Sequence, residues 1–327
     1  MLTSFNLLMI YLLFVLGFVL LIKGADFLVD GASSIARKFQ VPPMIIGLTI
    51  VSFGTSLPEL LVNISASIGG NPELAIGNIF GSNIANILLI LGVSAIIRPL
   101  PITRNIYFSE IPFSLVATLL VGFLANAALL ADTNALMLSR IDGGILLMFF
   151  VLFMGYIYVV FKSNQADDDE ADSDEPMPTG KASLMIIGGL LGLFFGGEWV
   201  VNGAVHIAEI IGLSQTFIGL TVVAVGTSLP ELVTSAVAAY KNNTDIAVGN
   251  VVGSNIFNLL WILGVSSLIR PLPFDVASNT DIVMIIFSSA LLLFAVAVGK
   301  GARIVRWEGV LFILVYIGYI SYLVVRG

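Results

Sequence analysis

The residues best suited to chemistry in this chain are two glutamates, each set in the same six-residue motif. The sequence GTSLPE occupies 54–59 and recurs at 226–231, so Glu59 and Glu231 each follow a Thr-Ser pair and a proline. Carboxylates, hydroxyls and backbone carbonyls are hard oxygen ligands, the type that calcium and similar cations prefer. The paired motifs therefore predict a cation site built from oxygen atoms.

Both motifs lie in strongly apolar sequence. The chain has 327 residues, of which 58% are hydrophobic and 11% are charged, and its mean hydropathy is +1.04. A bilayer core about 30 Å thick needs roughly 20 apolar residues per helix. Because the apolar runs are continuous rather than alternating, they predict an α-helical bundle and not a β-barrel. Ten such stretches are expected, near residues 6–35, 42–68, 73–97, 106–130, 142–161, 184–210, 214–240, 245–269, 279–299 and 307–325.

The prolines predict how the glutamates are presented. A proline inside a helix removes a hydrogen bond and crowds the carbonyl four residues earlier, so Pro58 and Pro230 should break their helices. Irregular backbone at membrane depth survives only against protein or a wet cavity. An ionised carboxylate facing lipid costs at least a few kcal/mol, so Glu59 and Glu231 should face inward. Their combined charge of −2 matches one calcium ion, or two or three sodium ions, and such competition for one site is the chemistry of an exchanger.

An internal repeat organises the whole chain. Adding 172 to a residue number relates matching segments without a gap from 47 to 101, including GTSLPEL, GSNI and RPLP. Each copy holds five predicted helices, and an odd number makes the second copy enter the membrane from the opposite side. We therefore expect two inverted-topology repeats, residues 1–161 and 184–327, joined by a linker at 162–183, as in alternating-access transporters.

The charged residues predict the orientation. The segment DDDEADSDE at 167–175 contains seven of the 21 acids, and the remaining 14 are balanced by 14 Lys and Arg. This acidity belongs to a solvated linker and indicates no nucleic-acid partner. One set of loops carries ten basic residues and the other carries three. The positive-inside rule then predicts a multi-pass protein of the plasma (cell inner) membrane, with extracytoplasmic termini and a cytoplasmic linker.

A second motif follows each glutamate helix. The pattern GNxxGSNIxN occupies 77–86 and 249–258. Residues four apart share a helix face, so Ser82 with Asn86, and Ser254 with Asn258, should point the same way. Two facing copies would then surround one midplane point with carboxylates, hydroxyls and amides.

These paired motifs resemble the α-repeats of sodium/calcium exchangers of the cation/calcium exchanger superfamily, prokaryotic type. The resemblance covers both repeats and the ten-helix plan. It implies a secondary active antiporter that exchanges sodium for calcium by alternating access, is electrogenic, and works as a monomer without a cofactor. The metal ligands that it implies are Glu59, Glu231, Thr55, Ser56, Thr227, Ser228, Ser82, Asn86, Ser254 and Asn258, with the backbone carbonyls of Ser52 and Ala224.

The resemblance also bears on motion and coupling. It implies that the first and sixth helices slide across the other eight, and the small residues of GADFLVDGA at 24–32 and GGEWVVNGA at 196–204 fit a loose contact. Potassium-dependent members carry an aspartate where this chain has Asn258, so potassium should not be co-transported. Two interpretations are open for the polar residues of these two helices. They guard ion passageways, or, as we rather expect, they lie near the membrane interface or in local pairs, for instance with Lys23. These residues are Asp26, Asp30, Glu198 and Asn202.

Three alternatives remain at this stage. A proton/calcium antiporter of the same superfamily is one, although the Thr-Ser pairs favour sodium, which needs extra hydroxyl ligands. A passive cation channel is another, in which paired carboxylates form a selectivity ring. An enzyme is disfavoured, because the chain has one histidine, no cysteine and no nucleophile-base pair.

Overall fold

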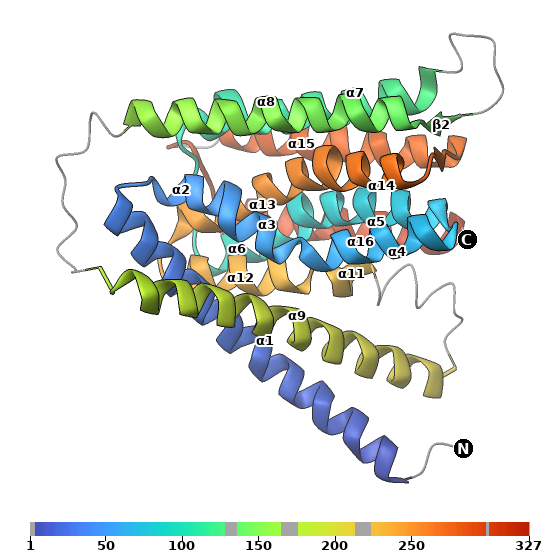
Figure 1. Cartoon of the computed structure of the whole chain (residues 1–327), viewed down its shortest axis with the longest axis horizontal. Helices are drawn as coiled ribbons and strands as arrows, with labels where there is room; N and C mark the ends of the chain where they lie inside the picture. The colour runs from blue at the N-terminus through green and yellow to red at the C-terminus, as the bar shows by residue number, and fades with distance from the viewer. Residues whose placement is uncertain (1–3, 128–135, 165–175, 213–223, 299–300, 327) are drawn as a thin grey trace.

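The computed structural model describes the chain apart from residues 1–3, 128–135, 165–175, 213–223, 299–300 and 327. The described residues are almost entirely helical, and several helices contain a π-helical stretch, labelled η (Figure 1). The first half comprises α1 (Ser4–Phe39), α2 (Pro43–Ile46), η1 (Gly47–Val51), α3 (Ser52–Thr55), α4 (Leu57–Gly69), α5 (Pro72–Ala85), η2 (Asn86–Ile90), α6 (Leu91–Ile97), η3 (Ile106–Glu110), α7 (Ile111–Asn126) and α8 (Arg140–Asn164). The second half comprises α9 (Thr179–Ile210), α11 (Ala224–Thr227), α12 (Leu229–Tyr240), α13 (Thr244–Ile256), η6 (Phe257–Ile262), α14 (Leu263–Ile269), the 3-10 turn η7 (Val276–Ser278), α15 (Asn279–Val298) and α16 (Arg306–Arg326).

The membrane-spanning segments agree with the apolar stretches. Among the described residues, eight helical segments are long and apolar enough to cross a bilayer, and the bent pair Pro43–Thr55 with Leu57–Gly69 makes a ninth. These nine correspond to nine of the ten predicted stretches. The tenth, 214–240, lies partly outside the described residues, which cover α11 and α12 only. The helical membrane fold is confirmed, and the number ten stays a prediction.

Two spans form the core of the bundle. In the segment Thr244–Ile269, 94% of the most apolar window is buried, and in Pro72–Ile97 the share is 78%. The other six single spans are buried over less than half of that window. The GNxxGSNIxN motifs lie in these two central spans, so their polar residues are enclosed by protein. Figure 1 shows α7 and α8 along one side of the molecule and α1 with α9 along the other.

The sequence repeat is also a structural repeat. Helices α4, α5 and α6 have counterparts in α12, α13 and α14, shifted by 172 residues. The two RPLP motifs each place Leu-Pro in a short strand: β1 (Leu100–Pro101) pairs antiparallel with β4 (Arg303–Ile304), and β3 (Leu272–Pro273) pairs with β2 (Met137–Leu138).

The loops after the two glutamate helices match as well. Gly70 follows α4 with φ +76°, and its counterpart Asn242 has φ +67°. This left-handed conformation is open to glycine and tolerated by asparagine. Arg98 donates to the Asn242 side chain at 2.9 Å. Its counterpart Arg270 lies so close to Gly70 that an added Cβ would come within 2.8 Å of its Nη1 atom.

Helices α1 and α9 pack directly against each other. A Cβ on Gly24 would lie 2.8 Å from the Gly189 carbonyl oxygen, and one on Gly196 would lie 2.8 Å from the Gly17 carbonyl. The small residues were expected to face the other eight helices. That expectation is wrong for Gly24 and Gly196, which let the two long helices approach each other. Gly197 does face the bundle, since an added Cβ would lie 3.7 Å from Pro230. The two helices therefore form one closely packed pair (Figure 1).

Candidate functional site

The predicted helix breaks are present in both GTSLPE motifs. Helix α3 ends at Thr55 and α4 begins at Leu57, and the two flanking segments are bent by 45°. Ser56 sits between them with φ −84° and ψ 8°, and Ser228 sits between α11 and α12 with φ −86° and ψ 6°. Pro58 is the second residue of its new helix, where a missing N–H leaves no helical hydrogen bond unmade. Each break therefore presents a serine and, one turn later, a glutamate.

The two carboxylates meet across the repeat. Ser56 donates to Glu231 Oε1 at 2.9 Å, and Ser228 donates to Glu59 Oε1 at 3.3 Å. Each glutamate is 1% exposed, and the two are close enough for their charges to interact. Since every bond links a serine of one motif to the glutamate of the other, the two broken helices share one polar centre. Ser82 joins this centre by accepting a hydrogen bond from Ser228 at 3.2 Å.

Several oxygen atoms of this centre have no hydrogen-bond partner. A buried polar atom without a partner costs about 1–3 kcal/mol, and more if it is charged, so native structures rarely leave one. The unpartnered buried oxygens here are Glu59 Oε2, Glu231 Oε2, Asn86 Oδ1, Asn258 Oδ1 and Ser254 Oγ. All five belong to residues that the sequence predicted as ligands. Their donor chemistry fits sodium or calcium, which bind through oxygen.

The predicted asparagines are oriented by two others. Asn86 donates through Nδ2 to Asn255 Oδ1 at 2.9 Å, and Asn258 donates to Asn83 Oδ1 at 3.0 Å. These bonds use the amide nitrogens and leave the amide oxygens available. Sequence reasoning missed Asn83 and Asn255 as contributors, although they are the third letter of each GSNI motif. Their recurrence at the 172-residue offset was the signal that could have found them.

The threonines follow the same reciprocal pattern. Thr55 donates to Asn250 Oδ1 at 3.0 Å, and Thr227 donates to Asn78 Oδ1 at 3.1 Å. Asn250 also donates to Ser235 at 3.0 Å. Asn78 and Asn250 are the second residue of each GNxxGSNIxN motif but were not predicted as site residues. The threonine hydroxyls are therefore adjacent to the carboxylate centre and held by the central helices.

The two predicted carbonyl positions lie in the short helices that precede the breaks. The Ser52 carbonyl accepts hydrogen bonds from the Ser56 N–H at 3.0 Å and from the Thr55 hydroxyl at 3.4 Å. The Ser52 hydroxyl donates to the Leu48 carbonyl at 2.8 Å. Ala224 is the first residue of α11. In this structure the Ser52 carbonyl is thus engaged within the chain.

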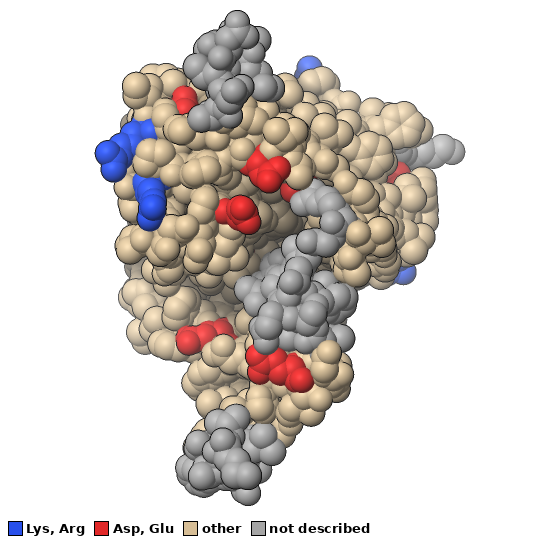
Figure 2. All heavy atoms as spheres, turned by 90° about the vertical axis from the view of Figure 1, so that its right-hand side faces the viewer, with Lys and Arg blue, Asp and Glu red and all other residues tan. Residues whose placement is uncertain are grey.

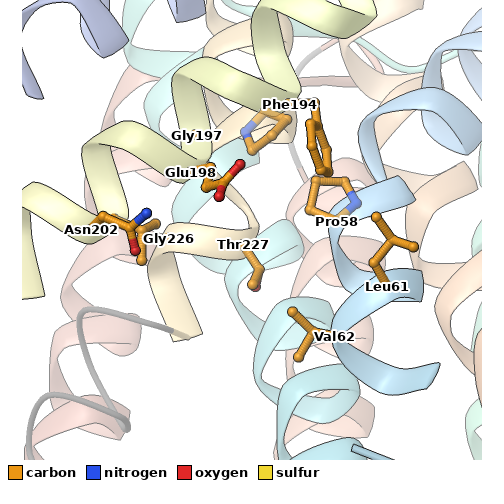
Figure 3. A pocket seen from close by; sticks show the side chains of 11 residues that line it. Pro58, Leu61, Val62, Phe194, Gly197, Glu198, Asn202, Gly226 and Thr227 are labelled. Atoms are coloured by element: carbon orange, nitrogen blue, oxygen red, sulfur yellow. The ribbon is translucent and has the colours of Figure 1, made fainter. Parts of the chain in front are cut away.

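A cavity borders one edge of this centre. It has a volume of about 230 Å³ and lies between α9, α4 and the break between α11 and α12 (Figure 3). Thr227 and Gly226 of the second GTSLPE motif line it, as do the two helix-breaking prolines. The cavity therefore extends to a hydroxyl-bearing residue of the site.

The comparisons with known proteins agree with this geometry. The family model described as "Sodium/calcium exchanger protein" matches residues 9–159 and 181–325. The chain belongs to the sodium/calcium exchanger family. The chain is 35% identical over 342 residues to the sodium/calcium exchanger MaX1 of Methanosarcina acetivorans, covering 95% of this chain and 97% of the relative. A Ca²⁺/H⁺ antiporter, ChaA of Bacillus subtilis, is more distant at 24% identity over 270 residues, covering 78% of this chain and 76% of that protein.

Solved structures give the same result. The structure of the sodium-calcium exchanger NCX_Mj soaked with sodium and strontium superimposes with a TM-score of 0.79 at 36% identity, covering 96% of this chain and 98% of that one. The predicted family is therefore confirmed. This chain is an integral membrane antiporter of a family of ion transporters, which are not enzymes.

Proposed function

We propose that the chain exchanges sodium for calcium across the plasma membrane by alternating access at the Glu59–Glu231 centre. The observation that carries this proposal is the reciprocal pair of Ser-to-Glu hydrogen bonds, which leaves one buried oxygen of each carboxylate unpartnered. Two buried negative charges need a compensating cation, because an unpaired buried charge is costly. One calcium ion meets that need, as do two or three sodium ions, so the two cations compete for the same oxygens.

The proposed ligands are the twelve residues predicted from the sequence. Glu59, Glu231 and the neighbouring serines bind both ions, and the threonines add the hydroxyls that favour sodium over protons as the driving ion. The carbonyls of Ser52 and Ala224 complete the set when the local helix rearranges around a bound ion.

The proposed architecture is ten membrane helices in two inverted repeats of five, with residues 162–183 as a cytoplasmic linker and both termini outside. Shifting both residue numbers by 172 turns the contact between Ser56 and Glu231 into the contact between Ser228 and Glu59. This symmetry is expected if the repeats are related by an axis in the membrane plane. The transporter is proposed to work as a monomer and to move net positive charge with sodium.

Potassium is proposed to play no part in transport. Asn258 donates its amide N–H to Asn83, a role that an aspartate cannot fill. The amide thus has a structural use in this chain beyond offering an oxygen to the ion.

Calcium uptake into reconstituted vesicles tests the proposal, with sodium, potassium and proton gradients imposed one at a time. Calcium uptake that requires sodium inside the vesicles to flow out, and that does not require potassium, supports the proposal. Uptake driven by a pH gradient in the absence of sodium would instead indicate a proton/calcium antiporter, as the relative ChaA is named. Calcium movement without any counter-ion would indicate a channel.

A further inference from the structure

The cavity beside the site has a single charged residue in its lining. Among the described lining residues, Glu198 of α9 carries the only ionisable side chain, and it is exposed. Figure 3 shows its carboxylate extending from α9 toward the space bordered by Pro58 and Thr227. Thr227, which lines the cavity, is 8% exposed, whereas its counterpart Thr55 is 0% exposed.

We propose that Glu198 recruits cations from solution into this cavity and passes them to Thr227 of the transport site. This inference rests on the proposed exchange function and adds a residue to it. A carboxylate beside low-dielectric walls focuses the electric field and raises the local concentration of cations, which raises their association rate. A divalent ion is attracted about twice as strongly as a monovalent one at the same place. Glu198 therefore acts on calcium capture more than on sodium capture.

Other acidic side chains gather at one end of the molecule. Figure 2 looks onto the side of the molecule that lies to the right in Figure 1, where Asp and Glu side chains surround a hollowed centre and Lys and Arg gather toward the edges. Asn202, one helical turn after Glu198, also lines the cavity. It offers a neutral position at which a second carboxylate can be added.

The test is the calcium dependence of sodium-driven uptake in vesicles, measured at low ionic strength for Glu198→Gln. The KM for calcium should rise about threefold or more while the maximal rate stays within twofold, because the site itself is intact. The difference should shrink when ionic strength is raised with an inert organic salt, since the Debye length falls to about 3 Å at 1 M. Asn202→Asp should lower the KM. Glu73→Gln, which removes an exposed carboxylate outside the cavity lining, should leave it unchanged.

Two results would overturn the inference: an unchanged KM in Glu198→Gln, or an equal rise in Glu73→Gln, which would indicate a general surface effect. The native chain distinguishes these failures from failure of the proposed function. If the native chain shows no sodium-driven uptake at all, the exchange function itself is wrong.

A second inference rests on the ion pairs of Lys241. This lysine follows α12, and its ammonium forms an ion pair with Asp30 of α1 at 2.7 Å and another with Asp26, one helical turn earlier. Partial burial lowers the pKa of an ammonium, but the hydrogen bonds to the two aspartates outweigh it and raise the pKa of Lys241 above its ordinary value. The two aspartates therefore pair with Lys241, and the expected pairing with Lys23 was wrong.

The residues at the matching positions of the other repeat cannot form these ion pairs. The counterparts of Asp26 and Asp30, 172 residues later, are Glu198 and Asn202, which line the open cavity. The counterpart of Lys241 is Gly69, which has no side chain to form an ion pair. The geometry points to Lys241 as a latch that holds the access path beside α1 closed, while the matching path beside α9 has none. This latch also rests on the proposed alternating access.

Cysteine labelling tests the latch, because the native chain contains no cysteine. Leu61→Cys reports on the open cavity, and Val233→Cys, at the matching position of the second repeat, reports on the closed path. Adding Lys241→Gln should raise the labelling rate of Val233→Cys by a membrane-impermeant maleimide at least threefold and lower that of Leu61→Cys. Lys241→Arg should keep the native rates. Native rates in Lys241→Gln would overturn the latch, and sodium-driven uptake by the same proteins checks the exchange function separately.

Discussion

Replacing Glu59 by glutamine is the perturbation whose effect follows most directly from the structure. The side chain is 1% exposed, and so is that of Glu231, so a bound calcium ion interacts with both charges away from water. Removing one partner of a buried ion pair costs roughly 3–5 kcal/mol. At 1.4 kcal/mol per factor of ten, the calcium dissociation constant should rise roughly 100- to 4,000-fold. Glutamine keeps an oxygen that can accept the Ser228 hydrogen bond, so the fold should survive.

The assay is calorimetric titration of the purified transporter with calcium, beside uptake in vesicles. Glu110→Gln is the matched control, because Glu110 is also fully buried and also accepts a single side-chain hydrogen bond, from Tyr156 at 2.9 Å, but lies outside the site. Its calcium affinity should stay within about threefold of native. The reasoning is refuted if Glu59→Gln binds calcium within tenfold of native, or if Glu110→Gln loses as much affinity.

Three further changes have defined outcomes. Asn258→Asp removes the N–H that donates a hydrogen bond to Asn83 and adds a third carboxylate to the site. Sodium-driven calcium uptake should fall at least tenfold and recover partly when potassium is present. Uptake at the native rate would contradict this. Thr55→Val removes a hydroxyl without changing shape, and should raise the KM for sodium more than the KM for calcium in the same vesicles; equal shifts would count against a sodium-specific hydroxyl. Gly189→Val puts a Cβ 2.6 Å from a backbone carbonyl of α1 and should lower the free energy of unfolding by about 1–3 kcal/mol, measured by thermal unfolding. Gly188→Val is the control, because a Cβ there meets nothing within 4 Å and should cause no such loss. Equal loss in both variants would mean that α1 and α9 are not closely packed.

The sequence was sufficient for the features that depend on local chemistry. A proline in the middle of an apolar span removes a helical hydrogen bond, and a carboxylate in such a span must face inward, so the breaks and the burial of Glu59 were predictable. The 172-residue repeat also predicted that both motifs would have the same structure.

The contacts that depend on how the helices pack were not predictable in the same way. Nothing in the spacing of residues says that Thr55 pairs with Asn250, or that Asn83 orients Asn258, because each bond joins helices from different halves of the chain. The partner of Asp30 was missed for the same reason: Lys23 is near in sequence, but Lys241 is near in space. The glycines of α1 were assigned to the wrong neighbour because a small residue shows that a helix is close but not which one.

Calcium binding at increasing sodium concentration tests the central claim most directly, that both ions use the oxygens around Glu59 and Glu231. If they do, the apparent calcium dissociation constant should keep rising with sodium, more steeply than in proportion and without a plateau, because more than one sodium ion replaces each calcium ion. An apparent dissociation constant that is independent of sodium, or that levels off while calcium stays bound, would contradict it.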